Sequence, residues 1–131
     1  MKANGARVLV ADDVRDSADT VVLLLAEKGY DARAVYDGQA VIDLADRWQP
    51  QCAVLDLSLP GMSGYDCARH LRRKFGASIR LVAYTGWSAD GDRKKAIDAG
   101  FDAVVVKPAD ALDLIRIVDA GVPAKDPLES R

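Results

Sequence analysis

Short apolar runs alternate with segments of helical periodicity along the whole chain, and this alternation limits what the chain can fold into. The apolar runs lie at 7–11, 32–36, 52–56, 79–84 and 103–106, and the helix-period segments at 17–28, 38–48, 64–74, 88–99 and 109–120. Strands that are apolar throughout are buried on both faces, which favours a parallel sheet covered by helices on both sides. The run at 32–36 alternates in polarity, so it is expected at a sheet edge.

Five strand–helix units in succession predict an α/β fold of the flavodoxin-like (βα)5 type. The sheet is expected to be parallel and doubly wound, with strand order 2-1-3-4-5 and three α/β/α layers. A chain of 131 residues suits one domain, which we place at residues 1–121. Residues 122–131 are rich in proline and charge, and we expect them to form a flexible C-terminal tail.

Composition excludes several classes of function. The net charge of −2 gives no electrostatic footprint for nucleic acid. The apolar runs are too short to span a bilayer, and acids follow the first one at once, so we expect no membrane segment, no signal peptide and a cytoplasmic protein. Cys52 and Cys67 are expected to be small buried thiols. His70, the only histidine, is expected on a solvated helix face without a metal.

Polar side chains stand at the ends of four of the five predicted strands. Asp12 and Asp13 follow the first strand, Asp56 ends the third, Thr85 follows the fourth and Lys107 the fifth. In a doubly wound sheet, ligands bind beyond the carboxyl ends of the strands. The predicted order places the first strand beside the third, so these groups are expected to converge on one edge.

This set of groups indicates phosphoryl chemistry. Three neighbouring carboxylates repel one another unless a cation lies among them, and hard oxygen ligands suit Mg²⁺. A lysine ammonium and a threonine hydroxyl beside the cation would bind phosphoryl oxygens, and Asp56 would be the nucleophile that forms an aspartyl-phosphate. Each residue alone is as readily explained as a helix N-cap, a turn residue or a solvated charge. Their joint occurrence at the ends of the right strands carries the prediction.

Four stretches carry a resemblance to a known family: VLVADD (8–13), VLDLSLPGMSGYD (54–66), AYTG (83–86) and GFDAVVVKP (100–108). In this order and spacing, the chain resembles the receiver domain of bacterial two-component response regulators. The resemblance covers roughly residues 6–120. It implies that Asp56 accepts a phosphoryl group from a sensor histidine kinase or a histidine phosphotransfer protein.

The resemblance also implies roles for the other site residues. Asp13 would ligate Mg²⁺ (or Mn²⁺) directly and Asp12 through water, together with Asp56. The backbone carbonyl of Ser58 would complete the metal shell. Thr85 would act as the switch hydroxyl and Lys107 would pair with the phosphoryl group. Pro108 follows the lysine, where the family often has a cis peptide bond. Phosphorylation would then switch the face formed by the fourth helix, the fifth strand and the fifth helix for a downstream protein partner.

Some residues depart from the family's pattern, and several alternatives stay open. Val104 stands three positions before Lys107, where the family commonly has an aromatic residue that couples to the threonine, and a valine has no ring for that coupling. Trp87 either contributes to a surface signal or only covers the site. The chain could be a stand-alone regulator or the receiver of a hybrid histidine kinase, and a monomer or a weak dimer. The competing functions are a degenerate receiver used as a binding scaffold and a small Mg²⁺-dependent phosphatase. Ser58 argues against the phosphatase, which usually carries a second acid at that position.

Overall fold

The computed structural model describes residues 5–86, 90–107 and 111–121, with eleven elements among them. The strands are β1 (Arg7–Ala11), β2 (Asp31–Val35), β3 (Cys52–Leu55), β4 (Arg80–Thr85) and β5 (Ala103–Val106). The helices are α1 (Arg15–Glu27), α2 (Gly38–Trp48), α3 (Gly64–Phe75), α4 (Asp90–Ala99) and α5 (Ala111–Gly121), with a 3₁₀ turn η1 (Gly76–Ser78) after α3.

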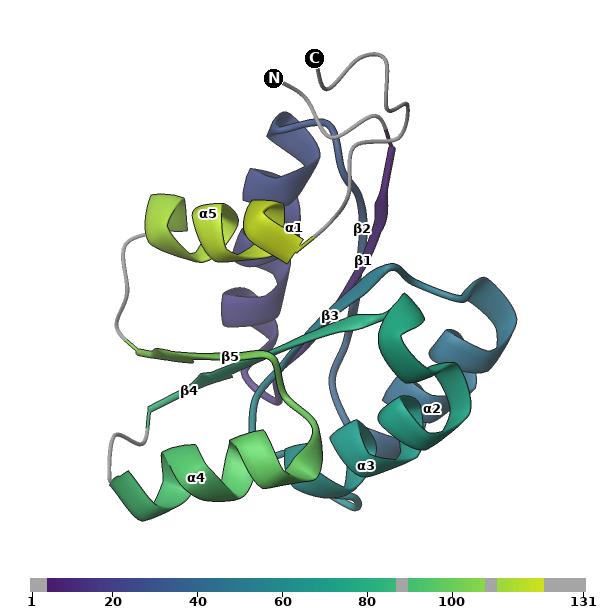
Figure 1. Cartoon of the computed structure of the whole chain (residues 1–131). Helices are drawn as coiled ribbons and strands as arrows, with labels where there is room; N and C mark the ends of the chain where they lie inside the picture. The colour runs from purple at the N-terminus through teal and green to yellow at the C-terminus, as the bar shows by residue number, and fades with distance from the viewer. Residues whose placement is uncertain (1–4, 87–89, 108–110, 122–131) are drawn as a thin grey trace.

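The five strands form one parallel sheet in the order β2-β1-β3-β4-β5. This confirms the predicted topology, with the alternating strand β2 at one edge. Figure 1 shows α1 and α5 on one face of the sheet and α2, α3 and α4 on the other. Leu9 and Ala11 of β1 join the core beneath α2, α3 and α4, and Val8 and Val10 join the core beneath α1 and α5. Both faces of the sheet are therefore buried, as apolar runs without alternation require.

Predicted and observed bounds agree for β1, α2 and β5, and several others shift by one or two residues. Helix α1 begins at Arg15, not at Ser17 as predicted, because Val14 is the N-cap and its carbonyl accepts from the amides of Ser17 and Ala18. Strand β2 begins and ends one residue earlier than predicted, and β4 one residue later. The bounds of a strand depend on its hydrogen bonds to the neighbouring strands, which a local sequence pattern does not contain. The predicted starts of α4 and α5, at 88 and 109, lie outside the described residues, as does the tail at 122–131.

The register of the sheet places the ends of the central strands level with one another. Ala11 pairs with Leu55, Leu55 pairs with Ala83, and Thr85 pairs with Val106. The residues that follow these pairs, including Asp12 and Asp56, therefore leave the sheet at the same edge. Within the described part of the chain, no helix is long and apolar enough to cross a membrane.

Candidate phosphoryl-transfer site at the carboxyl edge of the sheet

The three predicted acids meet beyond the carboxyl ends of β1 and β3. One carboxylate oxygen from each of Asp12, Asp13 and Asp56 lies within 4.8 Å of the others. Asp12 and Asp56 are buried, at 2% and 8% exposure, whereas Asp13 is exposed. The cluster thus has two anchored carboxylates and one that faces solvent, and three oxygen ligands of this kind match what a hard divalent cation prefers.

Lys107 places its ammonium between the two buried carboxylates. Its Nζ lies 2.5 Å from Oδ2 of Asp12 and 3.1 Å from Oδ2 of Asp56. The Lys107 amide donates to the Thr85 carbonyl at 2.7 Å. This bond holds the backbone of Lys107, and with it the Cα that carries the side chain, at the end of β5. The ammonium offsets part of the negative charge that burial of Asp12 and Asp56 brings together.

Burial and pairing act in opposite directions on the pKa values of this pair. Burial by itself raises the pKa of Asp12, but the hydrogen bonds from Lys107 and the Val14 amide and the lysine's charge outweigh it, so the pKa is lowered overall. Burial by itself lowers the pKa of Lys107, but hydrogen bonds and charges from Asp12 and Asp56 outweigh it and raise it. Both groups are therefore held in their charged forms.

The two buried acids are oriented by the same local turn. Oδ1 of Asp12 accepts from the amide of Val14 at 3.0 Å, and Oδ1 of Asp56 accepts from the amide of Ser58 at 3.0 Å. An aspartate that accepts from the amide two residues on forms an Asx turn, so each acid also has the turn role that aspartates commonly have. In both, the remaining oxygen points to Lys107.

Two glycines let the loop after Asp56 pack closely against α2 and the start of α3, because they have no Cβ. A Cβ on Gly64 would lie 2.3 Å from the Asp56 carbonyl oxygen, and one on Gly38 would lie 2.1 Å from the carbonyl oxygen of Met62. Gly61 has φ +81°, which glycine adopts readily, at the centre of a three-residue turn closed by the Met62 amide on the Pro60 carbonyl. The Pro-Gly turn and the start of α3 therefore fix the backbone that carries Asp56.

The remaining predicted residues have distinct outcomes. Thr85 ends β4 and is 1% exposed, at the same edge as the acids. Ser58 is exposed, and its amide orients Asp56, while its carbonyl as a metal ligand stays a prediction. Val104 is partly buried against the core beneath α2, α3 and α4. Trp87 and Pro108 lie outside the described residues.

The two cysteines are buried, and the histidine is partly buried. Cys52 and Cys67 are free, fully buried thiols, as expected. His70 is partly exposed, and its Nε2 is buried with no hydrogen-bond partner among the described residues, so only part of its ring has the solvated surroundings that we expected. Arg69 and Arg73 are exposed, as the pattern of α3 suggests, but α3 packs between α2 and α4, and His70 lies partly covered.

Two features of the site were not found from the sequence. The ring of Tyr84 lies beneath the Lys107 ammonium, with Nζ 5.1 Å from the ring centroid. The close approach of Gly64 to the Asp56 backbone is the other. Both depend on tertiary packing, and the only sequence signals were the position of Tyr84 beside Thr85 and the glycine in the motif that follows Asp56.

Comparison with known families agrees with this geometry. Residues 8–119 match the response regulator receiver domain. The chain belongs to this family. It is therefore a receiver domain of the kind used in two-component regulatory systems.

Solved receiver domains share the fold over nearly the whole chain. One is the receiver domain of a sensor histidine kinase from Pseudomonas aeruginosa PAO1, with a magnesium ion coordinated in its active site cleft. It is 26% identical, covers 90% of this chain and 98% of that chain, and has a TM-score of 0.81. A LuxR-family two-component response regulator from Aurantimonas sp. is 29% identical, with 88% and 84% coverage and a TM-score of 0.81. A CheY-like receiver domain protein from Methanospirillum hungatei has a TM-score of 0.85 over 90% and 94% of the chains, and at 20% identity it supports the fold alone.

Proposed function

We propose that this receiver domain accepts a phosphoryl group on Asp56 from a histidine kinase or a histidine phosphotransfer protein. The observation that carries the proposal is the position of Lys107, whose ammonium contacts Asp56 and Asp12 at the mouth of the acid cluster. An ammonium beside a nucleophilic carboxylate binds the oxygens of an incoming phosphoryl group, which carry the negative charge in the transition state.

The residues at the site fit a divalent cation. Asp12, Asp13 and Asp56 would hold it, with the Ser58 carbonyl as a further ligand, and this set of oxygens suits Mg²⁺, with Mn²⁺ as an alternative. The ion would supply positive charge to the phosphoryl oxygens when bound. The exposed Asp13 leaves one side of the cluster open to solvent, through which an ion and a phosphoryl donor can enter.

Asp56 has the geometry of a nucleophile held in place. One oxygen is oriented by the Ser58 amide and the other by Lys107, and an ionised carboxylate keeps further lone pairs for attack. A bond would form between a carboxylate oxygen and phosphorus. The bond from phosphorus to the donor's imidazole nitrogen would break, and that nitrogen would keep the electron pair. Lys107 and the Thr85 hydroxyl would then bind the oxygens transferred to Asp56.

The face formed by α4, β5 and α5 would report the phosphorylated state. Thr85 joins β4 to the segment that leads to α4, and its carbonyl is bonded to the Lys107 amide, so both switch residues are tied to this face. Ile97 on α4 and Val106 on β5 are 48% and 36% exposed. Exposed apolar side chains beside an element that moves suit the binding of a downstream protein partner. In this proposal the domain acts in the cytoplasm and signals through that partner. It does not turn over a substrate.

The test is intact mass after incubation with Mg²⁺ and acetyl phosphate. We expect a gain of one phosphoryl group that depends on Mg²⁺ and is absent in Asp56→Asn. Asp46→Asn is the matched control, since Asp46 lies on α2 and pairs with Lys74 away from the site. A folded wild-type chain that gains no phosphoryl group from acetyl phosphate or from phosphorylated histidine kinases would contradict the proposal and favour a binding scaffold.

A further inference from the structure

Tyr84 connects the acid cluster to the opposite layer of the molecule. It precedes Thr85 on β4, and its half-buried ring packs against the core beneath α1 and α5. The Lys107 ammonium lies 5.1 Å from the centroid of this ring, within the range at which a cation is attracted to an aromatic face. One face of the ring thus contacts the charge that bridges Asp12 and Asp56.

The same ring lines a hollow between α1 and α5. This hollow has a volume of about 380 Å³, and its apolar wall is formed by Val21 and Leu24 of α1 and Leu114 and Ile115 of α5. A half-buried ring next to open space has room to shift without displacing packed side chains. Among the described aromatic residues, Tyr84 therefore both contacts Lys107 and lines a hollow into which its own ring can move.

Val104 does not offer this route. Its side chain packs on the other face of the sheet, against the core beneath α2, α3 and α4. Tyr84 is paired in register with Val105, whose side chain lies on the α1 and α5 face. Among the described residues, the aromatic group beside the switch residues is therefore on β4, not β5, and faces α1 and α5 instead of α2, α3 and α4.

We propose that Tyr84 is a positioning residue, which holds the Lys107 ammonium over the acid cluster and transmits phosphorylation of Asp56 to the hollow between α1 and α5. The inference rests on the proposed function, since it needs Asp56 to be phosphorylated. Phosphorylation adds negative oxygens close to Nζ, so the ammonium moves toward them and its contact with the ring changes. The ring then takes a new position against Leu24 and Ile115.

The experiment combines kinetics with methyl NMR on the whole chain. The rate of phosphorylation by acetyl phosphate is measured by intact mass, and the methyl signals of Leu24 and Ile115 are compared before and after phosphorylation. The variants are Tyr84→Leu, which removes the ring, and Tyr84→Phe, which keeps it. Tyr36→Leu is the matched control, because Tyr36 also carries a cation over its ring (Arg15, 4.0 Å) but does not line the hollow.

We expect phosphorylation to shift the Leu24 and Ile115 signals in the wild type, in Tyr84→Phe and in Tyr36→Leu, and to leave them in place in Tyr84→Leu. The rate in Tyr84→Leu should fall about two- to fivefold, the range that a cation–π contact at a partly exposed site gives, and Tyr84→Phe should restore it. A wild-type rate in Tyr84→Leu, together with Leu24 and Ile115 signals that still shift on phosphorylation as they do in the wild type, would overturn the inference.

A second readout needs no substitution. The ring signals of Tyr84 in the wild type must move on phosphorylation, and ring signals that stay in place in a fully phosphorylated sample would overturn the inference even if Tyr84→Leu fails to fold. This failure is distinct from failure of the proposed function, in which the wild-type mass gains no phosphoryl group at all.

Discussion

At the scale of single residues, Lys107 determines how the site balances its charges. Asp12 and Asp56 are nearly inaccessible to water, and burying ionised carboxylates is costly unless a counter-charge is in contact. The lysine supplies that charge, but it also repels any second cation that enters the cluster. Removing it should therefore affect ion binding and folding in opposite directions.

Lys107→Met should bind divalent cations more tightly. One positive charge in contact with the cluster is lost, and at an effective dielectric constant near 20 such a charge is worth a few kcal/mol before solvent screening, so we expect Mg²⁺ affinity to rise on the order of tenfold. Isothermal titration at fixed ionic strength measures this. Lys74→Met is the control, because Lys74 pairs with Asp46 on the surface. Weaker binding in Lys107→Met would show that the lysine helps to organise the ligands.

The paired charges also predict how stability depends on pH. The pKa of Asp12 is lowered in the folded state, so its contribution is present above the ordinary value of 3.8 and is lost as pH falls through the folded-state pKa. The pKa of Lys107 is raised, so its contribution is present below 10.5 and is lost as pH rises through its folded-state value. Lys107→Met should remove the alkaline loss and move the acid loss to higher pH, since only the hydrogen bonds from Val14 and Ser17 then oppose the rise in the pKa of Asp12 that burial causes.

Urea unfolding in a chelator, over a series of pH values, measures this. Arg116→Met is the matched control, because Arg116 and Asp113 form a pair with side chains 74% and 58% exposed, which contributes little. An acid limb that stays in place in Lys107→Met would show that the lysine does not set the ionisation of Asp12.

At the scale of elements, sequence patterns predicted the bounds of several strands and helices and the residues that meet at the strand ends. They did not predict contacts between side chains that depend on tertiary packing. The bounds of β1, α2 and β5 follow from apolar runs and from glycine or aspartate at their ends. The convergence of Asp12, Asp13, Asp56 and Lys107 follows from the strand order, because parallel strands end at one edge. The contact between Tyr84 and Lys107 depends on which face a side chain takes and how far it reaches, which no local pattern encodes.

The junction between β3 and α3 gives a prediction at this scale. Gly64→Ala would place a Cβ 2.3 Å from the Asp56 carbonyl oxygen and 2.8 Å from the Leu57 Cα, both backbone atoms that cannot rotate away. We expect a loss of about 2 kcal/mol in the free energy of unfolding, typical of overpacking, together with slower phosphorylation, since the backbone of Asp56 must shift.

Urea unfolding and intact mass measure the two effects. Gly86→Ala is the control for stability, because a Cβ at Gly86 meets no atom within 4 Å. Equal stability of the two variants would mean that the start of α3 can move freely, and that Gly64 does not fix Asp56.

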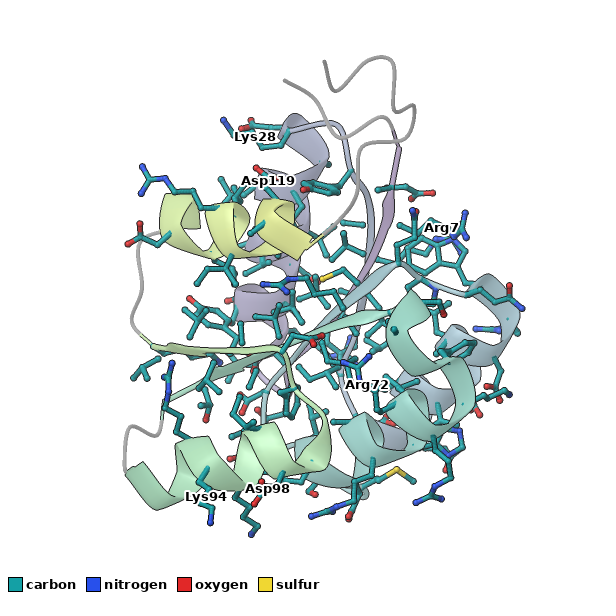
Figure 2. The ribbon with its side chains drawn as sticks, in the orientation of Figure 1. Arg7, Lys28, Arg72, Lys94, Asp98 and Asp119 are labelled. Carbon is teal, nitrogen blue, oxygen red and sulfur yellow. The ribbon has the colours of Figure 1, made fainter. Side chains whose placement is uncertain are left out.

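At the scale of the whole molecule, the two ends of the sheet have different roles. The carboxyl edge holds three acids in close proximity, an arrangement that favours ligand binding over stability. The opposite edge is held by Arg72 of α3 (Figure 2), which donates to the carbonyls of Gly76, Ile79 and Gly100 at 2.6–3.1 Å and to the Asp102 carboxylate at 2.7 Å. Asp102 in turn accepts from the amide of Leu81. One guanidinium thus joins α3 to the starts of β4 and β5.

Arg72→Lys should destabilise the fold without impairing phosphorylation. A lysine ammonium is a point charge and cannot reach all the carbonyls that lie around the edge of the planar guanidinium, so some of these partly buried acceptors lose their donor. We expect the free energy of unfolding to fall by about 2 kcal/mol in urea, with the phosphorylation rate of the folded protein unchanged within about twofold. Arg69→Lys is the matched control on the same helix, because Arg69 pairs with the exposed Asp66 at the surface and its replacement should leave both quantities unchanged. A slower phosphorylation rate in fully folded Arg72→Lys would contradict this division, because it would show that the packing of the amino edge reaches Asp56 through β3 and β4.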